Sequence, residues 1–333
     1  MRKILLMTQP PVTTYPEIAN ILSLLWDRKE RIIPWFSDHF VQLVVRPDNP
    51  YTYGDYYDHA DLDNYFSIIY GMSGLGWMRN NIETMPCERF TDYAEFAINN
   101  GYGLQACLDR YYISFTENYL KDHIYHATFI YGYDNEKREM YAADFWNGGR
   151  YEHITISYDE INASMNNDGI INMFKSYDAE YEIDLKLMKR YFEDYYYSRD
   201  SFGLYAASNK DYNRTAIFGL AYYDYVLSLA EKSKAEDYLD IRLFHLLYDH
   251  KVLMQIRMDY LKSLALFDDV KMEELIKENN EILDLTLKLR NKVIKFNYNH
   301  SAKTLENINS MLNELKKADT DFTAEVLTIL KDI

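Results

Sequence analysis

The spacing of apolar residues changes near residue 183, and this change constrains the fold more than any other feature of the chain. Four segments between residues 102 and 156 alternate apolar and polar side chains, which is the period of a half-buried strand. From about residue 183 to the end, apolar residues recur at the helical period, and Gly and Pro are almost absent. We therefore predict an α+β fold, in which an antiparallel sheet with packed helices (1–180) precedes an α-helical domain (184–333).

A β-hairpin is the strongest local prediction within the sheet. Residues 125–133 and 139–145 alternate in the manner of strands, and the turn-forming residues Asp134-Asn-Glu-Lys join them. Residues 102–113 and 152–156 predict two further strands. The capping box Ser157-Tyr-Asp-Glu then predicts that a helix starts directly after the last strand.

The remaining segments divide into helices and one long loop. Residues 40–45 fit either a buried strand or a short helix, and residues 47–80 predict a loop with one short helix near 65–70. Gly71-Met-Ser-Gly-Leu-Gly lacks the Lys-Ser/Thr of a phosphate loop and predicts a turn. Helices are expected at 16–28, 91–100, 184–198, 212–232, 237–267, 271–296, 302–317 and 321–332.

Charge and composition exclude several classes of function. The net charge of −16 opposes binding to nucleic acid, whose phosphates need a positive field. Two cysteines, Cys87 and Cys107, do not make the disulfide framework of a small secreted protein. The apolar run at residues 4–7 is too short for a signal peptide, and no window reaches the length of a membrane span, so we expect a cytoplasmic protein.

His126 and Asp144 lie on the two strands of the predicted hairpin. A turn centred between Asn135 and Glu136 places His126 opposite Phe145, and a shift of one residue places it opposite Asp144. Facing residues have Cβ atoms roughly 5 Å apart, which lets an imidazole hydrogen-bond a carboxylate. Such a pair is either the base and orienting carboxylate of a nucleophilic triad or a structural contact within a sheet.

The residues around this pair resemble a known family. Leu108-Asp-Arg-Tyr-Tyr-Ile, Tyr119, His123, the stretch His126-Ala-Thr-Phe-Ile-Tyr-Gly-Tyr-Asp, Ala143-Asp144 and Ile156-Ser-Tyr-Asp-Glu are similar to the N-terminal domain of butirosin biosynthesis protein H. The resemblance covers roughly residues 15–170, and the segment from Arg242 to Lys251 looks like the C-terminal part of longer relatives. It implies a papain-like fold and a protein of thiotemplated peptide clusters, either an acyl or peptidyl transferase or an accessory protein. His126 would be the general base and Asp144 its orienting partner.

The chain departs from this family at the nucleophile. Catalytic members carry a cysteine at the start of a helix in the N-terminal stretch, whereas Trp35-Phe-Ser-Asp-His-Phe-Val-Gln-Leu contains none. Ser37 is the nearest chemical substitute, and the family's chain order predicts that it lies nearer to His126 than either cysteine does. Cys107 is expected on a strand and Cys87 in a loop. We further expect Asp38, His39, Tyr111, Tyr112 and His123 to contact substrate.

Two functions remain open. The missing cysteine favours an accessory or binding protein whose partner is a carrier protein or a carrier-linked peptide. The alternative is a transferase or hydrolase that acts on a carrier-bound thioester or amide through His126 and Asp144. Neither requires a cofactor. A metal site at Asp122, His123, His126 and Asp144 would use suitable ligand types, but their spacing does not match known zinc sites. His245 and Asp249 share one helix face and predict an ion pair.

Overall fold

The computed structural model describes residues 1–47, 59–62, 72–81, 88–165, 169–201, 216–234 and 236–333. The chain divides into two compact units. Unit 1 contains residues 1–32 and 69–180, and unit 2 contains residues 33–68 and 181–333. The boundary at 180 agrees with the change of hydrophobic period, while residues 33–68 belong with the C-terminal part of the chain. Helix α2 (Lys29–Asp38) spans the first crossing and contains Pro34 in its interior.

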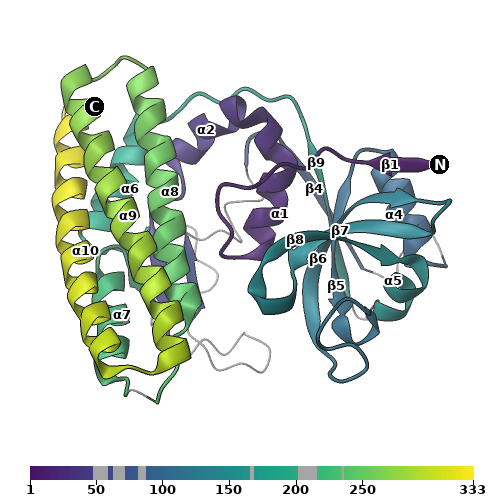
Figure 1. The fold of residues 1–333 in the computed structure, drawn as a ribbon. Coiled ribbons are helices and arrows are strands. Elements are labelled where there is room, and N and C mark those ends of the chain that lie inside the picture. Colours follow the sequence, from purple (N-terminus) through teal and green to yellow (C-terminus); the bar gives the residue numbers. More distant parts are fainter. Residues whose placement is uncertain (48–58, 63–71, 82–87, 166–168, 202–215, 235) are drawn as a thin grey trace. The chain divides into compact units, whose positions relative to one another are not determined.

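Unit 1 is built on one antiparallel sheet of seven strands, shown in Figure 1. Its strands follow the order β4-β9-β5-β6-β7-β8, and β1 pairs with β6. The strands are β1 (Arg2–Ile4), β4 (Leu75–Asn81), β5 (Gly103–Asp109), β6 (Tyr125–Asp134), β7 (Glu139–Phe145), β8 (Tyr151–Ser157) and β9 (Ile170–Ser176). The helices of this unit are α1 (Pro16–Leu25), η1 (Trp26–Arg28), α4 (Phe90–Asn99), η4 (Arg110–Tyr112), η5 (Asn147–Gly149) and α5 (Tyr158–Ser164).

The four predicted strands and the hairpin are present, except that the first strand ends at Asp109 and residues 110–112 form η4 instead. Strands β6 and β7 pair as a hairpin, but Asp134 lies opposite Glu139, so the turn is centred one residue later than expected, and the register shifts again between Ile130 and Gly132. Both predicted pairings of His126, opposite Phe145 or Asp144, are therefore wrong. Strand β7 pairs with β8 without interruption. Ser157 caps α5 through the predicted capping box with Glu160. The prediction of a loop over residues 47–80 is wrong where it can be compared, because β3 (His59–Leu62) and β4 lie in it, and residues 65–70 are outside the described part. Strands β1 and β9 had no prediction.

Helices cover both faces of this sheet, and successive residues along each strand contact the helices on opposite faces. Leu104, Ile130 and Ala142 point to one face and form a buried core with residues of α4 and α5. Tyr151 points to the other face, where its hydroxyl donates to Asn20 Oδ1 of α1 over 2.9 Å. Figure 1 shows α1 on one side of the sheet, with α4 and α5 on the opposite side. Residues on one strand therefore face either α1 or the α4–α5 core, according to their parity.

Unit 2 is mainly helical, as predicted. A small sheet in the order β10-β2-β3 is its only strand structure in the described residues, and β10 has two residues. A single helix occupies the segment that we expected to divide at residues 318–320, so that prediction is wrong. The elements are β2 (Leu43–Arg46), β3, β10 (Ile217–Phe218), α6 (Leu185–Tyr196), α7 (Ala221–Lys232), α8 (Ile241–Ser263), α9 (Asp269–Asn299) and α10 (Ala302–Ile329).

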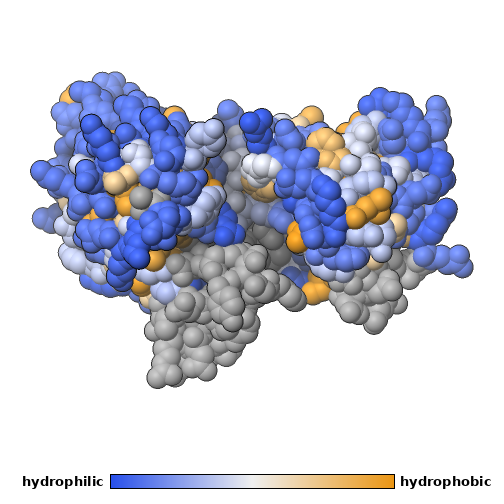
Figure 2. Space-filling view, turned by 60° about the horizontal axis from the view of Figure 1, so that its bottom comes forward, coloured by the Kyte–Doolittle hydropathy of each residue, from blue (hydrophilic) through white to orange (hydrophobic). Residues whose placement is uncertain are grey.

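The surface reflects the acidic composition. Hydrophilic residues occupy most of the described surface that faces the viewer in Figure 2, and hydrophobic residues form small separate groups on it. None of the helices in the described ranges is both long and apolar enough to cross a membrane.

Candidate functional site

The predicted His126–Asp144 pair is present in unit 1. The Nδ1 atom of His126 lies 3.0 Å from Oδ2 of Asp144 and 2.8 Å from its Oδ1. Because Phe129 pairs with Ala143, Asp144 falls beside Thr128, and His126 lies two residues further along the same face. The contact is therefore diagonal between the strands, within the reach that neighbouring strands allow. A ring that donates from Nδ1 leaves Nε2 as its free nitrogen.

Asp144 is buried and accepts several other hydrogen bonds. Its side chain is fully inaccessible, and Thr128 donates to Oδ2 over 2.8 Å. The Arg110 guanidinium lies 3.3 Å from the same oxygen, also donates to the carbonyl of Phe145, and stacks over Trp146. Arg110 therefore neutralises the carboxylate that His126 contacts. Sequence analysis assigned Arg110 no role, although it lies within the segment that carries the family resemblance.

The pair faces away from α1. Asp144 pairs with Glu152 and Phe145 pairs with Tyr151, so Asp144 and Tyr151 point to opposite faces of the sheet. Tyr151 contacts α1, whereas Trp146, which has the same parity as Asp144, belongs to the core beneath α4 and α5. A nucleophile on α1 would consequently lie across the sheet from the Asp144 carboxylate.

A second His–Asp pair lies at the entrance of β6. His123 Nδ1 is 2.6 Å from Oδ2 of Asp109, and the backbone N–H of Tyr111 donates to the other carboxylate oxygen. The His123 ring stacks on Tyr111 at 4.2 Å between centroids, and Tyr112 approaches both rings edge-on. The structure thus brings together His123, Tyr111 and Tyr112, three of the residues that we expected to contact substrate. It adds Asp109, which sequence analysis did not select.

Unit 2 holds a third pair at Asp38 and His39. His39 Nδ1 lies 2.6 Å from Oδ1 of Asp38, and the His39 ring stacks on Trp35 at 4.3 Å. Asp38 is fully buried and also accepts a hydrogen bond from the Tyr181 hydroxyl over 2.7 Å. Burial and this carboxylate raise the pKa of Tyr181 above its usual range. The arrangement resembles a packed structural contact, because most polar atoms of Asp38 have partners inside the unit.

Ser37 does not have the surroundings of an activated nucleophile. It lies at the C-terminal end of α2, where unpaired carbonyl groups disfavour a developing negative charge. Its side chain is buried, and its hydroxyl donates to the carbonyl of Ile33 over 2.7 Å. Arg257 donates to the carbonyl oxygen of Ser37 over 2.7 Å, which caps this helix end. Ser37 and His126 belong to different units, so their proximity stays a prediction.

The other candidates of the sequence have ordinary surroundings. Cys107 lies on β5, as expected, and Cys87 lies outside the described residues. No three His, Cys, Asp or Glu side chains converge as a metal site in the part of the chain that the structure describes. His245 Nε2 lies 3.8 Å from Asp249 Oδ1 on α8, and Arg290 contacts its other ring nitrogen.

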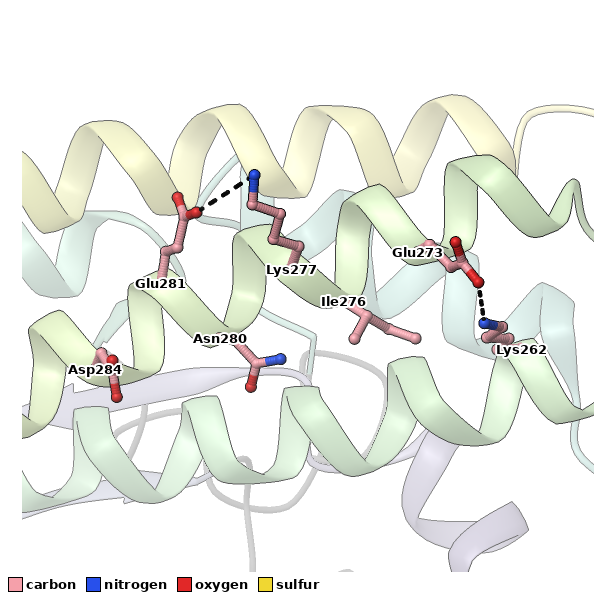
Figure 3. Close-up of a pocket in the computed structure, with 7 residues that line it drawn as sticks. All are labelled: Lys262, Glu273, Ile276, Lys277, Asn280, Glu281 and Asp284. Atoms are coloured by element: carbon pink, nitrogen blue, oxygen red, sulfur yellow. Dashed lines mark hydrogen bonds and ion pairs between the residues drawn. The ribbon is translucent and has the colours of Figure 1, made fainter.

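An open groove between α8 and α9 has the character of a solvated face. Figure 3 shows its side chains, which include Ile276, Asn280 and Asp284. One ion pair joins the two helices, Lys262–Glu273 at 2.8 Å, and a second lies along α9, Lys277–Glu281 at 3.9 Å. Because the two ion pairs are exposed and their charges neutralise each other, they give the groove little attraction for a charged ligand.

The three imidazoles share one chemical property. His39, His123 and His126 each direct Nδ1 toward a carboxylate that is almost wholly buried, which fixes the ring and leaves Nε2 available. The side chains of His123 and His126 are 55% and 32% exposed, so a ligand can reach both rings from solvent. Comparison with known proteins adds no assignment, because no family model matches the chain and no curated protein matches it.

Proposed function

We propose that this protein is a papain-like accessory protein that binds a carrier-linked peptide intermediate without turning it over. The family resemblance supplies the class of ligand and the papain-like description of the fold. The α+β architecture with an antiparallel sheet is compatible with that description. Retention of a His–Asp pair without a cysteine in the expected stretch is what a binding protein derived from an enzyme would have.

The state of the His126–Asp144 pair is the observation that carries this proposal. In a catalytic triad the carboxylate orients the imidazole, and the nucleophile hydrogen-bonds the other ring nitrogen. Here Asp144 also accepts hydrogen bonds from Arg110 and Thr128, so it is held as part of the packed sheet. Among the described residues, Asp144 is the only hydrogen-bond partner of the His126 ring. The hydroxyl of Ser37 is bound to a backbone carbonyl instead.

One feature favours an enzyme as the second candidate. Nε2 of His126 is free and a third of the side chain is exposed, which a general base requires. In that case the protein would be an acyl or peptidyl transferase, or a hydrolase, and its nucleophile would have to approach His126 from outside the described contacts.

The test uses purified protein with carrier-bound acyl and peptidyl thioesters. We expect saturable binding by the parent protein with no release of free thiol above the uncatalysed rate. Ser37→Ala should bind as the parent does, because its hydroxyl contacts only the helix. His126→Ala should bind more weakly, but still measurably, and thiol release should not change.

Two results would contradict the proposal. Thiol release by the parent that disappears in both Ser37→Ala and His126→Ala would establish the enzyme. Failure of the parent to bind any carrier-linked thioester would remove the accessory function altogether. Arg110→Met is an informative companion, because removal of the competing guanidinium should strengthen the Asp144–His126 contact without supplying a nucleophile.

A further inference from the structure

Helix α9 carries a second row of apolar side chains on its solvent side. Its buried face packs against α8 and α10. A further row, whose members follow one another at intervals of three, four or seven residues, is half-buried or exposed. In this row Ile294 is 52% exposed and Tyr298 is 89% exposed, the highest value for any large hydrophobic side chain in the described residues. We call this row the outer stripe: Ile276, Asn280, Leu283, Leu287, Ile294 and Tyr298.

The spacing of the outer stripe is that of a helix–helix contact. Intervals of three, four and seven residues keep side chains on one line along a helix, as in the seam of a coiled coil. A helix that packs on one side only has polar residues opposite its buried face. On α9 the outer stripe interrupts that polar face, although the buried row already supplies the contacts within unit 2. The outer stripe therefore has the pattern of a second packing surface.

The charges of α9 are separated along its length. Residues 269–284 carry six acidic and two basic side chains, whereas residues 285–299 carry four basic side chains and no acidic one. The helix dipole favours this order, but its effect falls off within the first and last turn. Lys288, Lys292 and Lys295 have no ion pair in the described part of the chain. These three ammonium groups are therefore free to attract an acidic helix, and the acidic half of a second α9 is such a helix.

Two copies of α9 complement each other only when they run in opposite directions. In an antiparallel pair about a two-fold axis, the acidic half of each helix lies beside the basic half of the other. A parallel pair would place like charges side by side, which is repulsive. Helix α9 as a whole carries six acidic and six basic side chains, so the repulsion from the net charge of −16 arises elsewhere on the chain.

The two ends of the outer stripe also fit each other. Ile276 and Asn280 line the groove between α8 and α9, as Figure 3 shows, while Tyr298 at the other end is almost wholly exposed. Leu287 lies eleven residues from both Ile276 and Tyr298, which is about 16 Å along the helix. A two-fold axis at Leu287 would therefore bring Tyr298 of one copy to the groove of the other. In a single copy that groove is solvated.

We propose that α9 is a self-association surface, on which two copies of this chain pair antiparallel along the outer stripe about a two-fold axis at Leu287. Ile276 contacts Tyr298 of the second copy, and Leu287 contacts its own counterpart. The contact is about 33 Å long and formed by one helix from each copy, which is small for a standard interface, so we expect a weak dimer that forms at micromolar concentrations. The dimer goes beyond the proposed function and does not depend on it.

Sedimentation velocity over a concentration series from about 1 to 200 μM measures the dimer. Parent protein should pass from the monomer mass of 39.7 kDa to twice that mass, with a single dissociation constant. Ile294→Gln and Tyr298→Ser should each raise that constant at least about tenfold, since each removes apolar contact area without disturbing a buried side chain. Phe96→Ser is the matched control, because Phe96 is 58% exposed on α4 of unit 1 and its loss should leave the dimer unchanged.

Cysteine cross-linking tests the antiparallel register. Leu287→Cys places a thiol at the two-fold axis, and mild oxidation should join two copies, because the residue there faces its own counterpart. Ile276→Cys and Tyr298→Cys should not cross-link as single variants, since each lies about 33 Å along the helix pair from its own counterpart. The variant that combines both substitutions should cross-link. Parent protein, which contains Cys87 and Cys107, gives the background.

Other outcomes would overturn this inference. Parent protein that stays a monomer at the highest concentration has no such dimer, and a monomer that binds an unrelated amphipathic helix on the outer stripe has a different occupant there. A dimer that Ile294→Gln and Tyr298→Ser leave unchanged has its interface elsewhere. Cross-linking of Ile276→Cys alone, without that of Leu287→Cys, would establish a parallel pair. Because none of these measurements uses a carrier-linked peptide, their failure would leave the proposed function standing.

Discussion

At the scale of single residues, His250 makes the stability of the protein depend on pH. It lies on α8 with no exposed surface, and its Nε2 donates to the carbonyl of Val41 over 2.7 Å. Its Nδ1 has no hydrogen-bond partner in the described part of the chain. Burial and the neighbouring charges of Lys251 and Arg257 lower the pKa of His250 well below 6.5. The folded protein therefore keeps this ring neutral in weak acid, while the unfolded chain protonates it.

The sign of the pH dependence follows from that difference. The free energy of unfolding should be unaffected by His250 above about pH 6.5 and should fall as the pH drops below that value. The expected loss is about 1.4 kcal/mol at pH 5.5. Urea unfolding at pH 7.5, 6.5 and 5.5 measures it. His250→Gln, which can still donate to Val41, should lose this part of the slope, and an identical slope in both proteins would contradict the argument.

At the scale of elements, the sequence predicts those segments whose own pattern decides their structure. The hairpin of β6 and β7 alternates clearly and has a turn-forming connection, so the hairpin and a His126–Asp144 hydrogen bond were predicted correctly, while the predicted register was wrong. Strand β4 contains Gly76, Arg79 and Asn80, which have low strand preference, and it exists because all seven residues pair with β9. Such pairing depends on a partner strand about ninety to a hundred positions away, which no local pattern reveals.

Helix α10 also shows that contacts with distant residues decide structure, because it is one helix where the local pattern predicted two. We expected two helices, 302–317 and 321–332, with Asp319 in the break between them. In the structure its carboxylate is buried and binds Lys251 at 2.5 Å and the hydroxyls of Tyr195 and Tyr223 at 2.6 and 2.9 Å. The side chain is thus occupied by three other helices and has no free oxygen for a cap. The orientation of Arg110 toward Asp144 also depends on tertiary packing.

This buried network makes a prediction about the helical unit. Lys251 and Asp319 are both fully buried, so removal of one leaves the other without its counter-charge. Lys251→Met and Asp319→Leu should each lower the free energy of unfolding by about 3–5 kcal/mol. The double variant should lose less than the sum, since no unpaired charge remains. Chemical denaturation of the four proteins gives the coupling free energy, and additive losses would show that the two groups act independently.

At the scale of the whole molecule, the grouping of the chain into units depends on contacts between distant segments. Strand β2 pairs with β10, about 170 residues further along, and Arg257 on α8 caps the C-terminal end of α2. These contacts place residues 33–68 with the C-terminal helices. The change of hydrophobic period at residue 183 locates one crossing between the units. The hydrophobic period contains no information about the two earlier crossings between the units, because α2 and β2 have the local sequence pattern of any short helix and strand.

The net charge of the whole chain leads to the last prediction. With 52 acidic and 36 basic side chains, like charges repel on average in the compact state, and the hydrophilic surface in Figure 2 leaves them in contact with solvent. Raising NaCl from about 0.02 to 0.3 M shortens the Debye length from roughly 20 to 6 Å and should raise the Tm by roughly 2–4 °C at pH 7.5. Differential scanning calorimetry measures this shift.

Two exposed positions inside long helices provide matched controls for this effect. Glu314 on α10 and Lys288 on α9 are exposed, and neither has an ion pair among the described residues. Glu314→Gln removes a negative charge from an acidic molecule and should raise the Tm at low salt. Lys288→Gln removes a positive charge and should lower it. Both differences should be under about 0.5 kcal/mol and should shrink at 0.3 M salt, because screening weakens every charge at the surface. A Tm that falls with added salt would mean that attractive ion pairs outweigh the net repulsion. The changes in Tm caused by Glu314→Gln and Lys288→Gln would then no longer have opposite signs.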